Sequence, residues 1–277
     1  MLQTNTDFHK VPLMKTAYPP ILEMKNVTVV RGDENRKVLN GVSLKVLAGE
    51  NIAILGPNGA GKTSLMKLIT REYYPLAKDG TVFRVWGRDR WHLFELRDRL
   101  GLVSNDLQAV CAREISGMEA VLSGFFGGIG LHRERVTREQ KEKALKVLEF
   151  LEIAHLKNRK MSVMSSGEAR RFLIARALVH DPRALILDEP TNSLDLRSTR
   201  HFRSMVRKIA RSGVNIVLIT QTLQDIIPEI TRVVLMKNGR LLEDGPKEKI
   251  LTARHIGALF DMRVRISRHD GYYYAPG

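Results

Sequence analysis

The chain contains 277 residues, of which 43% are hydrophobic and 27% charged, proportions typical of a soluble globular protein with a substantial core. No apolar run approaches the roughly eighteen residues that span a bilayer, and the first twenty residues hold no continuous apolar stretch, which argues against a secretory signal. The formal net charge of +15 indicates an acidic neighbour such as nucleic acid, anionic lipid or bound nucleotide, unless the cations form ordinary solvated surface.

The single cysteine, Cys111, excludes an internal disulfide and fits a reducing cytosol, so we expect a cytoplasmic protein. Prolines within 1–20 disfavour regular structure there, and we expect this segment to be an N-terminal extension. The main domain is predicted over 21–245, with a helical subdomain at about 106–164. Residues 246–277 are predicted to form a small C-terminal tail.

The first part of the chain predicts a sheet with helices packed on it. Enrichment in Val and Ile over 21–30, alternation over 38–46 and a continuous apolar run over 52–55 indicate strands. We further expect a helix over 64–70, a strand over 81–86, a short helix over 92–100 and a buried strand over 101–104. The predicted fold class is therefore α/β, with a β-rich N-terminal part.

From about 106 to 164 the pattern becomes mostly helical, with a glycine interruption at 124–130. Thr137 and Gln140 have the spacing of a capping box, and the apolar stripe of an amphipathic helix follows them. The basic residues here are interspersed with glutamates, so we favour a solvated face over a partner-binding surface.

The rest of the chain alternates helices and strands. Helices are expected from Gly167 to about His180 and over 197–210, and strands over 184–187, 215–220 and 233–236. Asn238-Gly239 is a strong hairpin signal after the last of these strands. We interpret the aromatic run at 272–274 as the packing of a terminal strand, rather than as a surface that stacks on a ligand.

A phosphate-binding loop (Walker A) is indicated by Gly56-Pro57-Asn58-Gly59-Ala60-Gly61-Lys62-Thr63, which matches G-x-x-x-x-G-K-[ST] between a buried strand and a helical run beginning at Ser64. Glycines let successive N–H groups point at a phosphate, and the helix directs its positive end to the same place. Lys62 is expected to neutralise the β- and γ-phosphates, and the Thr63 hydroxyl to ligate Mg²⁺. The chain is therefore predicted to bind a nucleotide.

The run Leu185-Ile186-Leu187-Asp188-Glu189 predicts the acidic half of the same site (Walker B). An apolar strand delivers a carboxylate to its C-terminal edge, where Asp188 is placed to hold Mg²⁺ through water. Glu189 is placed to polarise a water for attack on the γ-phosphate.

A third motif, Met164-Ser165-Ser166-Gly167-Glu168, resembles the L-S-G-G-Q signature of the ATP-binding-cassette (ABC) ATPase family. The resemblance covers roughly 21–245 and keeps the family's order of segments, with Asp195 at the place of the D-loop. It implies an ABC-type P-loop NTPase domain with an inserted helical subdomain. In the family, the helix end opened by Ser165 and Gly167 meets the γ-phosphate held by a second subunit, so the resemblance implies a head-to-tail dimer around two Mg-ATP.

Three positions depart from the family pattern. Asn105, with Gln108 three residues later, stands where the family usually has a Gln that contacts Mg²⁺ and water. Gln221 replaces a histidine that contacts the γ-phosphate, and Gln can donate a hydrogen bond but cannot carry a proton. The aromatic residue that stacks on adenine is replaced near Arg31, whose guanidinium can still stack as a cation.

The resemblance implies the ATP-binding and ATP-hydrolysing subunit of an ABC transporter, of importer type or a solitary cassette, acting on a separate transmembrane permease at the inner face of the membrane. Two alternatives stay open. The net charge of +15 favours a soluble ABC protein that acts on nucleic acid or the ribosome. Gln221 and Asn105 favour an ATP-binding switch with little turnover. The cargo and the direction of transport are not indicated.

Overall fold

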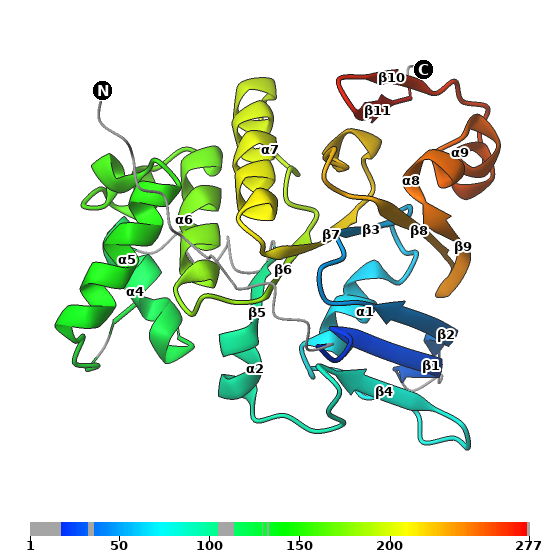
Figure 1. Cartoon of the computed structure of the whole chain (residues 1–277), viewed down its shortest axis with the longest axis horizontal. Helices are drawn as coiled ribbons and strands as arrows, with labels where there is room; N and C mark the ends of the chain where they lie inside the picture. Colours follow the sequence, from blue (N-terminus) through cyan, green and yellow to red (C-terminus); the bar gives the residue numbers. More distant parts are fainter. Residues whose placement is uncertain (1–17, 33–35, 105–113, 129, 132, 276–277) are drawn as a thin grey trace. The chain divides into compact units, whose positions relative to one another are not determined.

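The computed structural model describes residues 18–32, 36–104, 114–128, 130–131 and 133–275 (Figure 1). The chain divides into two compact units. Unit 1 contains the described residues of 97–185 and 191–214, and unit 2 those of 17–96, 186–190 and 215–277. Unit 2 therefore includes both the predicted phosphate-binding loop and the predicted acidic pair.

Unit 2 contains a three-stranded antiparallel sheet with the strand order β2-β1-β4. Its strands are β1 (Leu22–Arg31), β2 (Arg36–Val46) and β4 (Val82–Val85). Leu22 pairs with Val46 on one side and with Val85 on the other. Alternate residues of β2 are buried and exposed towards its end, so this sheet has one core face. The three predicted strands are confirmed, with ends shifted by one or two residues.

A second sheet of unit 2 is mainly parallel. β3 (Ile52–Leu55) pairs in parallel with β7 (Asn215–Thr220) and β8 (Arg232–Lys237), and β9 (Arg240–Pro246) runs antiparallel to β8. The last residues of β6 (Ala184–Asp188) come next to β7 in the strand order. Every residue of β3, β6 and β7 is buried, which explains their nearly continuous apolar sequences. The hairpin predicted at Asn238-Gly239 is the turn between β8 and β9.

Helix α1 (Lys62–Ile69) follows β3 and packs against β2 (Figure 1). The other elements of unit 2 are the 3-10 turn η4 (Leu223–Asp225), α8 (Lys247–Ile250), α9 (Ala253–Phe260), β10 (Ser267–His269) and β11 (Tyr272–Tyr274), and α2 (Leu93–Arg99) lies where the two units join in sequence. β11 packs on η4, and Tyr273 is 5% exposed. The interpretation of the aromatic run as the packing of a terminal strand is therefore confirmed.

Unit 1 is mostly helical, with β5 (Leu100–Val103) beside the first residues of β6. Its helices are α4 (Gly117–Leu122), α5 (Arg138–Phe150), α6 (Ser166–Leu178) and α7 (Leu196–Arg211), with 3-10 turns η1 (Ser123–Phe126), η2 (Ala154–Leu156) and η3 (Met161–Val163). Helices α4, α5 and α6 pack against one another (Figure 1). The capping box of Thr137 and Gln140 is confirmed at the start of α5. Cys111 and the rest of 105–113 lie outside the described residues.

Among the described helices, none combines the length and the apolar character needed to cross a membrane.

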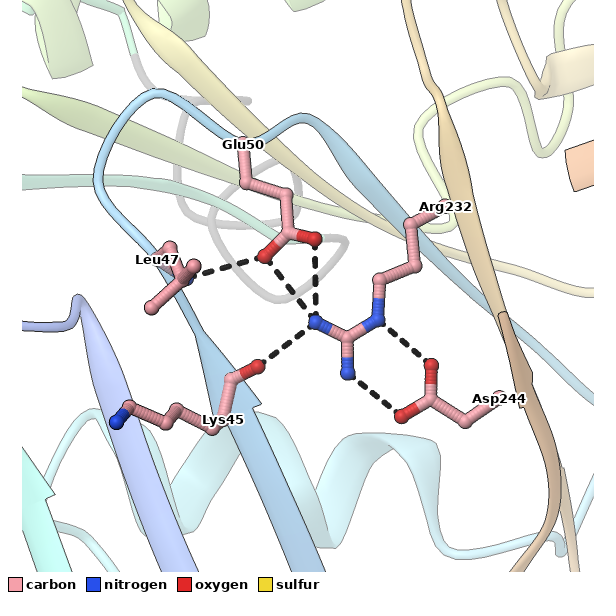
Figure 2. A network of polar contacts seen from close by, with 5 residues as sticks. All are labelled: Lys45, Leu47, Glu50, Arg232 and Asp244. Atoms are coloured by element: carbon pink, nitrogen blue, oxygen red, sulfur yellow. Dashed lines mark hydrogen bonds and ion pairs between the residues drawn. The ribbon is translucent and has the colours of Figure 1, made fainter. Parts of the chain in front are cut away.

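A half-buried arginine, Arg232, joins three segments of unit 2 (Figure 2). Arg232 on β8 donates to both carboxylate oxygens of Asp244 on β9 at 2.6 Å, and to both of Glu50 at 3.1 Å. It also donates to the Lys45 carbonyl at 2.8 Å, and Glu50 accepts from the Leu47 N–H. The hydrogen bonds that Arg232 donates to Asp244, and secondarily to Glu50, raise the Arg232 pKa further above its already high value. The network ties the β2–β3 turn to the edge of the parallel sheet.

We predict that Arg232→Met lowers the free energy of unfolding by about 3 kcal/mol, because it leaves two carboxylates facing each other without their cation. Urea denaturation measures this. Arg84 is the matched control: it pairs with Asp89 at 2.9 Å but is 46% exposed against 23% for Arg232. Arg84→Met should lower the free energy of unfolding by no more than about 1 kcal/mol. Equal losses in the two variants would contradict a structural role for the network.

Candidate nucleotide-binding site

The predicted phosphate-binding loop lies between a buried strand and a helix, as its sequence requires. β3 ends at Leu55 and α1 begins at Lys62, with Gly61 in a left-handed conformation (φ 102°) at the helix N-cap. The Gly56 N–H donates to the Thr220 carbonyl on β7 at 3.2 Å, which anchors the start of the loop. The loop and the first turn of α1 therefore place their backbone N–H groups at one end of the helix, where an anion is stabilised.

Lys62 is buried beneath this loop and is 4% exposed. Its Nζ donates to the carbonyl oxygens of Gly56 at 2.8 Å and Pro57 at 2.9 Å, and pairs with Glu189 Oε1 at 3.2 Å. The lysine of the first motif and the glutamate of the second are therefore in direct contact, although 127 positions separate them (189 − 62).

The predicted acidic pair lies at the carboxyl end of β6. Asp188 is the last residue of the strand and is 7% exposed. Glu189 follows in a left-handed conformation (φ 45°), and its N–H donates to the Ile219 carbonyl of β7 at 2.8 Å. From this position Glu189 pairs with Lys62 of the phosphate-binding loop.

The donors available for a metal ion are oxygen atoms. Thr63 is exposed in the first turn of α1, and Asp188 supplies a carboxylate at the strand end. A hydroxyl and a carboxylate are the ligands that Mg²⁺ takes at phosphate sites, together with water and phosphate oxygens, so the donor chemistry fits this ion. Asn105, the third predicted ligand, and its neighbour Gln108 lie outside the described residues.

Gln221 directly follows β7, on the strand next to β3 in the sheet. The turn that carries it is fixed by Thr220, whose hydroxyl donates to Asp225 at 2.9 Å and accepts from the Thr222 N–H at 3.0 Å. Gln221 itself is half-buried. Gln221 thus follows the end of β7, the strand whose Ile219 carbonyl accepts from the Glu189 N–H.

Arg31 is exposed at the end of β1, and its guanidinium carbon lies 5.5 Å from the centroid of the Tyr73 ring. Lys67 Nζ lies 5.8 Å from the same centroid. Arg31 was predicted from the sequence to be a site residue, whereas Tyr73 was not. The one signal that could have found it is an aromatic residue shortly after the helix of the phosphate-binding loop.

The signature residues form the N-terminal cap of α6 in unit 1. Ser165 accepts from the Glu168 N–H at 3.2 Å, and Glu168 accepts from the Ser165 N–H at 2.8 Å, a complete capping box. Ser166 donates to the Ser193 carbonyl at 3.4 Å, which links the cap to the predicted D-loop. Gly167 occupies the first turn of the helix. The predicted helix start at this motif is confirmed.

Asp195 caps the next helix, α7, and accepts from the Ser198 N–H at 2.7 Å and its hydroxyl at 3.1 Å. These hydrogen bonds, first that of the Ser198 N–H, lower the Asp195 pKa below its ordinary value. Arg170 is fully buried on α6 and donates to the Asn192 carbonyl at 3.4 Å. The segment before α7 is therefore held at both ends within unit 1.

A parallel strand, a glycine-rich loop with a buried lysine, a helix N-terminus and an acidic strand end define the chain as a phosphate-loop NTPase of α/β fold. A family model described as ABC transporter matches residues 39–192, more than half of the chain. The chain therefore belongs to the ABC transporter family, and it is an ATP-binding, ATP-hydrolysing subunit of that family.

Individual relatives agree with this assignment. The chain is 34% identical over 251 residues to the uncharacterized ABC transporter ATP-binding protein YlmA of Bacillus subtilis, covering 89% of this chain and 93% of the relative. It is 32% identical over 250 residues to the hemin import ATP-binding protein HmuV of Bradyrhizobium diazoefficiens, covering 86% and 88%. The fold is similar to an ATP-binding cassette of an ABC transporter in its ADP conformation, with a TM-score of 0.74, 24% identity and coverage of 87% and 98%.

The capping box of α6 predicts a pH-dependent stability. The Ser165 N–H and hydroxyl, with Arg159 and Arg171 nearby, lower the Glu168 pKa below its ordinary value of 4.5 despite partial burial. A lowered pKa stabilises the fold above the unfolded pKa, and this contribution is lost as pH falls through the folded pKa. Glu168→Gln keeps an oxygen acceptor for the Ser165 N–H and removes only the charge.

We expect Glu168→Gln to lower the free energy of unfolding at pH 7 by about 0.5–1 kcal/mol, since it also removes a negative charge near a helix N-terminus. The difference from the unsubstituted protein should shrink as the pH falls from 5 towards 3. Urea denaturation at both ends of this range measures it. A difference that stays constant with pH would show that the carboxylate charge does not stabilise the cap.

Proposed function

We propose that the chain dimerises head-to-tail around two Mg-ATP and drives a separate membrane permease of an uptake system. The observation that carries the catalytic part of the proposal is the 3.2 Å contact between Lys62 and Glu189, because it joins the cation for the phosphates to the carboxylate for the attacking water.

Each of the residues at the site has one task in this proposal. The N–H groups of the loop 56–61 and of the first turn of α1, with Ser64, bind the β- and γ-phosphates, and Lys62 neutralises their charge. Glu189 orients and polarises the attacking water. Gln221 donates a hydrogen bond to the γ-phosphate side of the site, but it passes no proton.

Thr63, Asp188 and Asn105 are the residues that would hold Mg²⁺. The ion would neutralise charge that develops on the phosphate oxygens. Arg31 supplies a planar cation on which the adenine can stack, and the Tyr73 ring supports this cation from one side.

A second copy of the chain is proposed because the signature residues would bind the phosphate of a nucleotide that another copy holds. Ser165, Ser166 and Gly167 present a capped helix end in unit 1, and such an end binds an anion. In the family that the chain resembles, such an end meets the γ-phosphate held by another subunit, and we assign Asp195 to the same interface. Two copies would therefore complete two nucleotide sites at once.

The permease partner and the direction of transport are proposed from the relatives. HmuV is a hemin import protein by its name, and it aligns over 86% of this chain. An uptake role places the chain at the inner face of the cell membrane, bound to the permease.

Lys62→Ala should weaken ATP binding by at least about 100-fold, because it removes a charge-assisted contact to the triphosphate. Isothermal titration calorimetry with Mg-ATP measures the affinity. Lys78→Ala, a change of an exposed lysine in unit 2, is the matched control and should bind ATP as the unsubstituted protein does. Retained affinity in Lys62→Ala would contradict the assignment of the phosphate-binding loop.

Glu189→Gln should abolish phosphate release and let ATP accumulate in a dimer, since the water is no longer polarised while both nucleotide sites still close. Phosphate release in the steady state and size-exclusion chromatography with light scattering measure the two effects. A protein that stays monomeric with ATP would contradict the two-copy site.

Steady-state phosphate release by Gln221→His, compared with the unsubstituted protein and Glu189→Gln, distinguishes an ATPase from an ATP-binding switch. Turnover in the unsubstituted protein that vanishes in Glu189→Gln supports the ATPase, with Gln221 in place of the histidine. No turnover in the unsubstituted protein, with a gain in Gln221→His, supports the switch.

A further inference from the structure

The turn between β8 and β9 is hydrogen-bonded to the phosphate-binding loop. The Gly239 N–H donates to the Ala60 carbonyl at 2.8 Å, and the Gly239 carbonyl accepts from the Asn40 N–H on β2 at 2.8 Å. One residue of the turn therefore joins the loop to the antiparallel sheet. Ala60 is 2% exposed, so its carbonyl depends on this partner within the protein.

The three backbones at this point approach so closely that side chains do not fit between them. Gly239 has a φ of 72°, and a Cβ added to it would lie 2.8 Å from the Val38 carbonyl oxygen. A Cβ added to Gly61 would also lie 2.8 Å from that oxygen, and 3.3 Å from the Gly239 Cα. Although the Met236 side chain also lies beside Gly61, the backbones of Val38, Gly239 and Gly61 approach one another directly, so a shift of the turn is transmitted to the loop.

The strand residue before the turn also contacts the C-terminal part of unit 2. Lys237, the last residue of β8, donates from its Nζ to the Ala258 carbonyl of α9 at 2.9 Å. The same Nζ pairs with Asp261 Oδ1 at 2.6 Å, and the Lys237 side chain is 20% exposed. Lys237 thus connects the C-terminal end of α9 to the residues of the turn.

We propose that Gly239 and Lys237 are positioning residues of the phosphate-binding loop, so that affinity for the triphosphate depends on the C-terminal helix α9. This inference rests on the proposed nucleotide site. It assigns to that site two residues that hold the phosphate-binding loop in place without contacting the nucleotide. The physical reason is that the loop binds phosphate through backbone N–H groups, whose directions depend on where the loop backbone is held.

Lys237→Gln tests the connection without altering the turn itself. We expect about a fivefold loss of affinity for both ATP and inorganic tripolyphosphate, from a weakened charge-assisted tether. The turnover number at saturating ATP should change less than twofold, because the catalytic groups are untouched. Lys249→Gln, which removes one exposed charge on α8, should leave the affinities unchanged, and Lys237→Arg should restore them.

Gly239→Ala tests the contact itself, and Gly80→Ala is its matched control: Gly80 has a φ of 75°, and a Cβ there would meet nothing within 4 Å. Both variants place a side chain on a left-handed glycine, but only Gly239→Ala should weaken tripolyphosphate binding, by about tenfold. If Gly239→Ala does not fold, the affinities of Lys237→Gln and Lys237→Arg test the inference alone.

Calorimetric titration of the full chain with ATP and with tripolyphosphate, alongside urea unfolding without ligand, gives every quantity needed. Equal affinities in Lys237→Gln and Lys249→Gln would overturn the inference, as would a loss confined to ATP, which would implicate the base instead of the phosphates. Failure of the unsubstituted protein to bind either ligand would instead contradict the proposed function.

Discussion

The phosphate-binding loop must direct several backbone N–H groups at one point, and it has few side chains of its own to hold that shape. Two partners from distant parts of the sequence support it: the Thr220 carbonyl on β7 accepts from the Gly56 N–H, and the Gly239 N–H donates to the Ala60 carbonyl. Within the motif, Lys62 donates to the carbonyls of Gly56 and Pro57. The arrangement of β7, β3 and β8 in the parallel sheet is what brings them together. The rest of unit 2 can be understood as the scaffold for this loop.

The sequence predicted the features that depend on neighbours along the chain. Alternation and apolar runs located the strands, and the spacing of Thr137 and Gln140 located a helix start, because these patterns are set by local geometry. Asn238-Gly239 predicted the hairpin for the same reason. The assignments of site residues followed from motif order, and the structure places Lys62 and Glu189 in contact.

The features that the sequence did not predict all depend on tertiary packing. The contact of Gly239 with Ala60 and the position of Tyr73 beside Arg31 join segments with no shared local pattern. The Arg232 network is the clearest case, since Arg232 and Glu50 lie 182 positions apart. A pattern of residue types shows which side chains are charged or apolar, but the choice of partner is made by the fold.

Many of the cations that give the chain its charge of +15 serve as internal donors. Arg159, Lys208, Lys237 and Lys247 each donate to a backbone carbonyl at 2.6–2.9 Å, at or near the end of a helix or turn. Burial lowers the Lys247 pKa, so this residue is not an ordinary surface lysine. Such residues satisfy carbonyl groups at helix ends that would otherwise lack partners. The net charge is therefore weaker evidence for a nucleic-acid partner than its size suggests.

The ion pair of Lys62 and Glu189 makes nucleotide binding a competition for one cation. A phosphate that binds Lys62 must displace the Glu189 carboxylate. Part of the free energy of nucleotide binding is therefore used to separate the Lys62–Glu189 ion pair. In the proposed site, a triphosphate competes better than a diphosphate, because its terminal phosphate brings more negative charge to the lysine. Re-formation of the pair after hydrolysis then favours release of the product. The Lys62–Glu189 contact can in this way favour replacement of the bound diphosphate by a triphosphate.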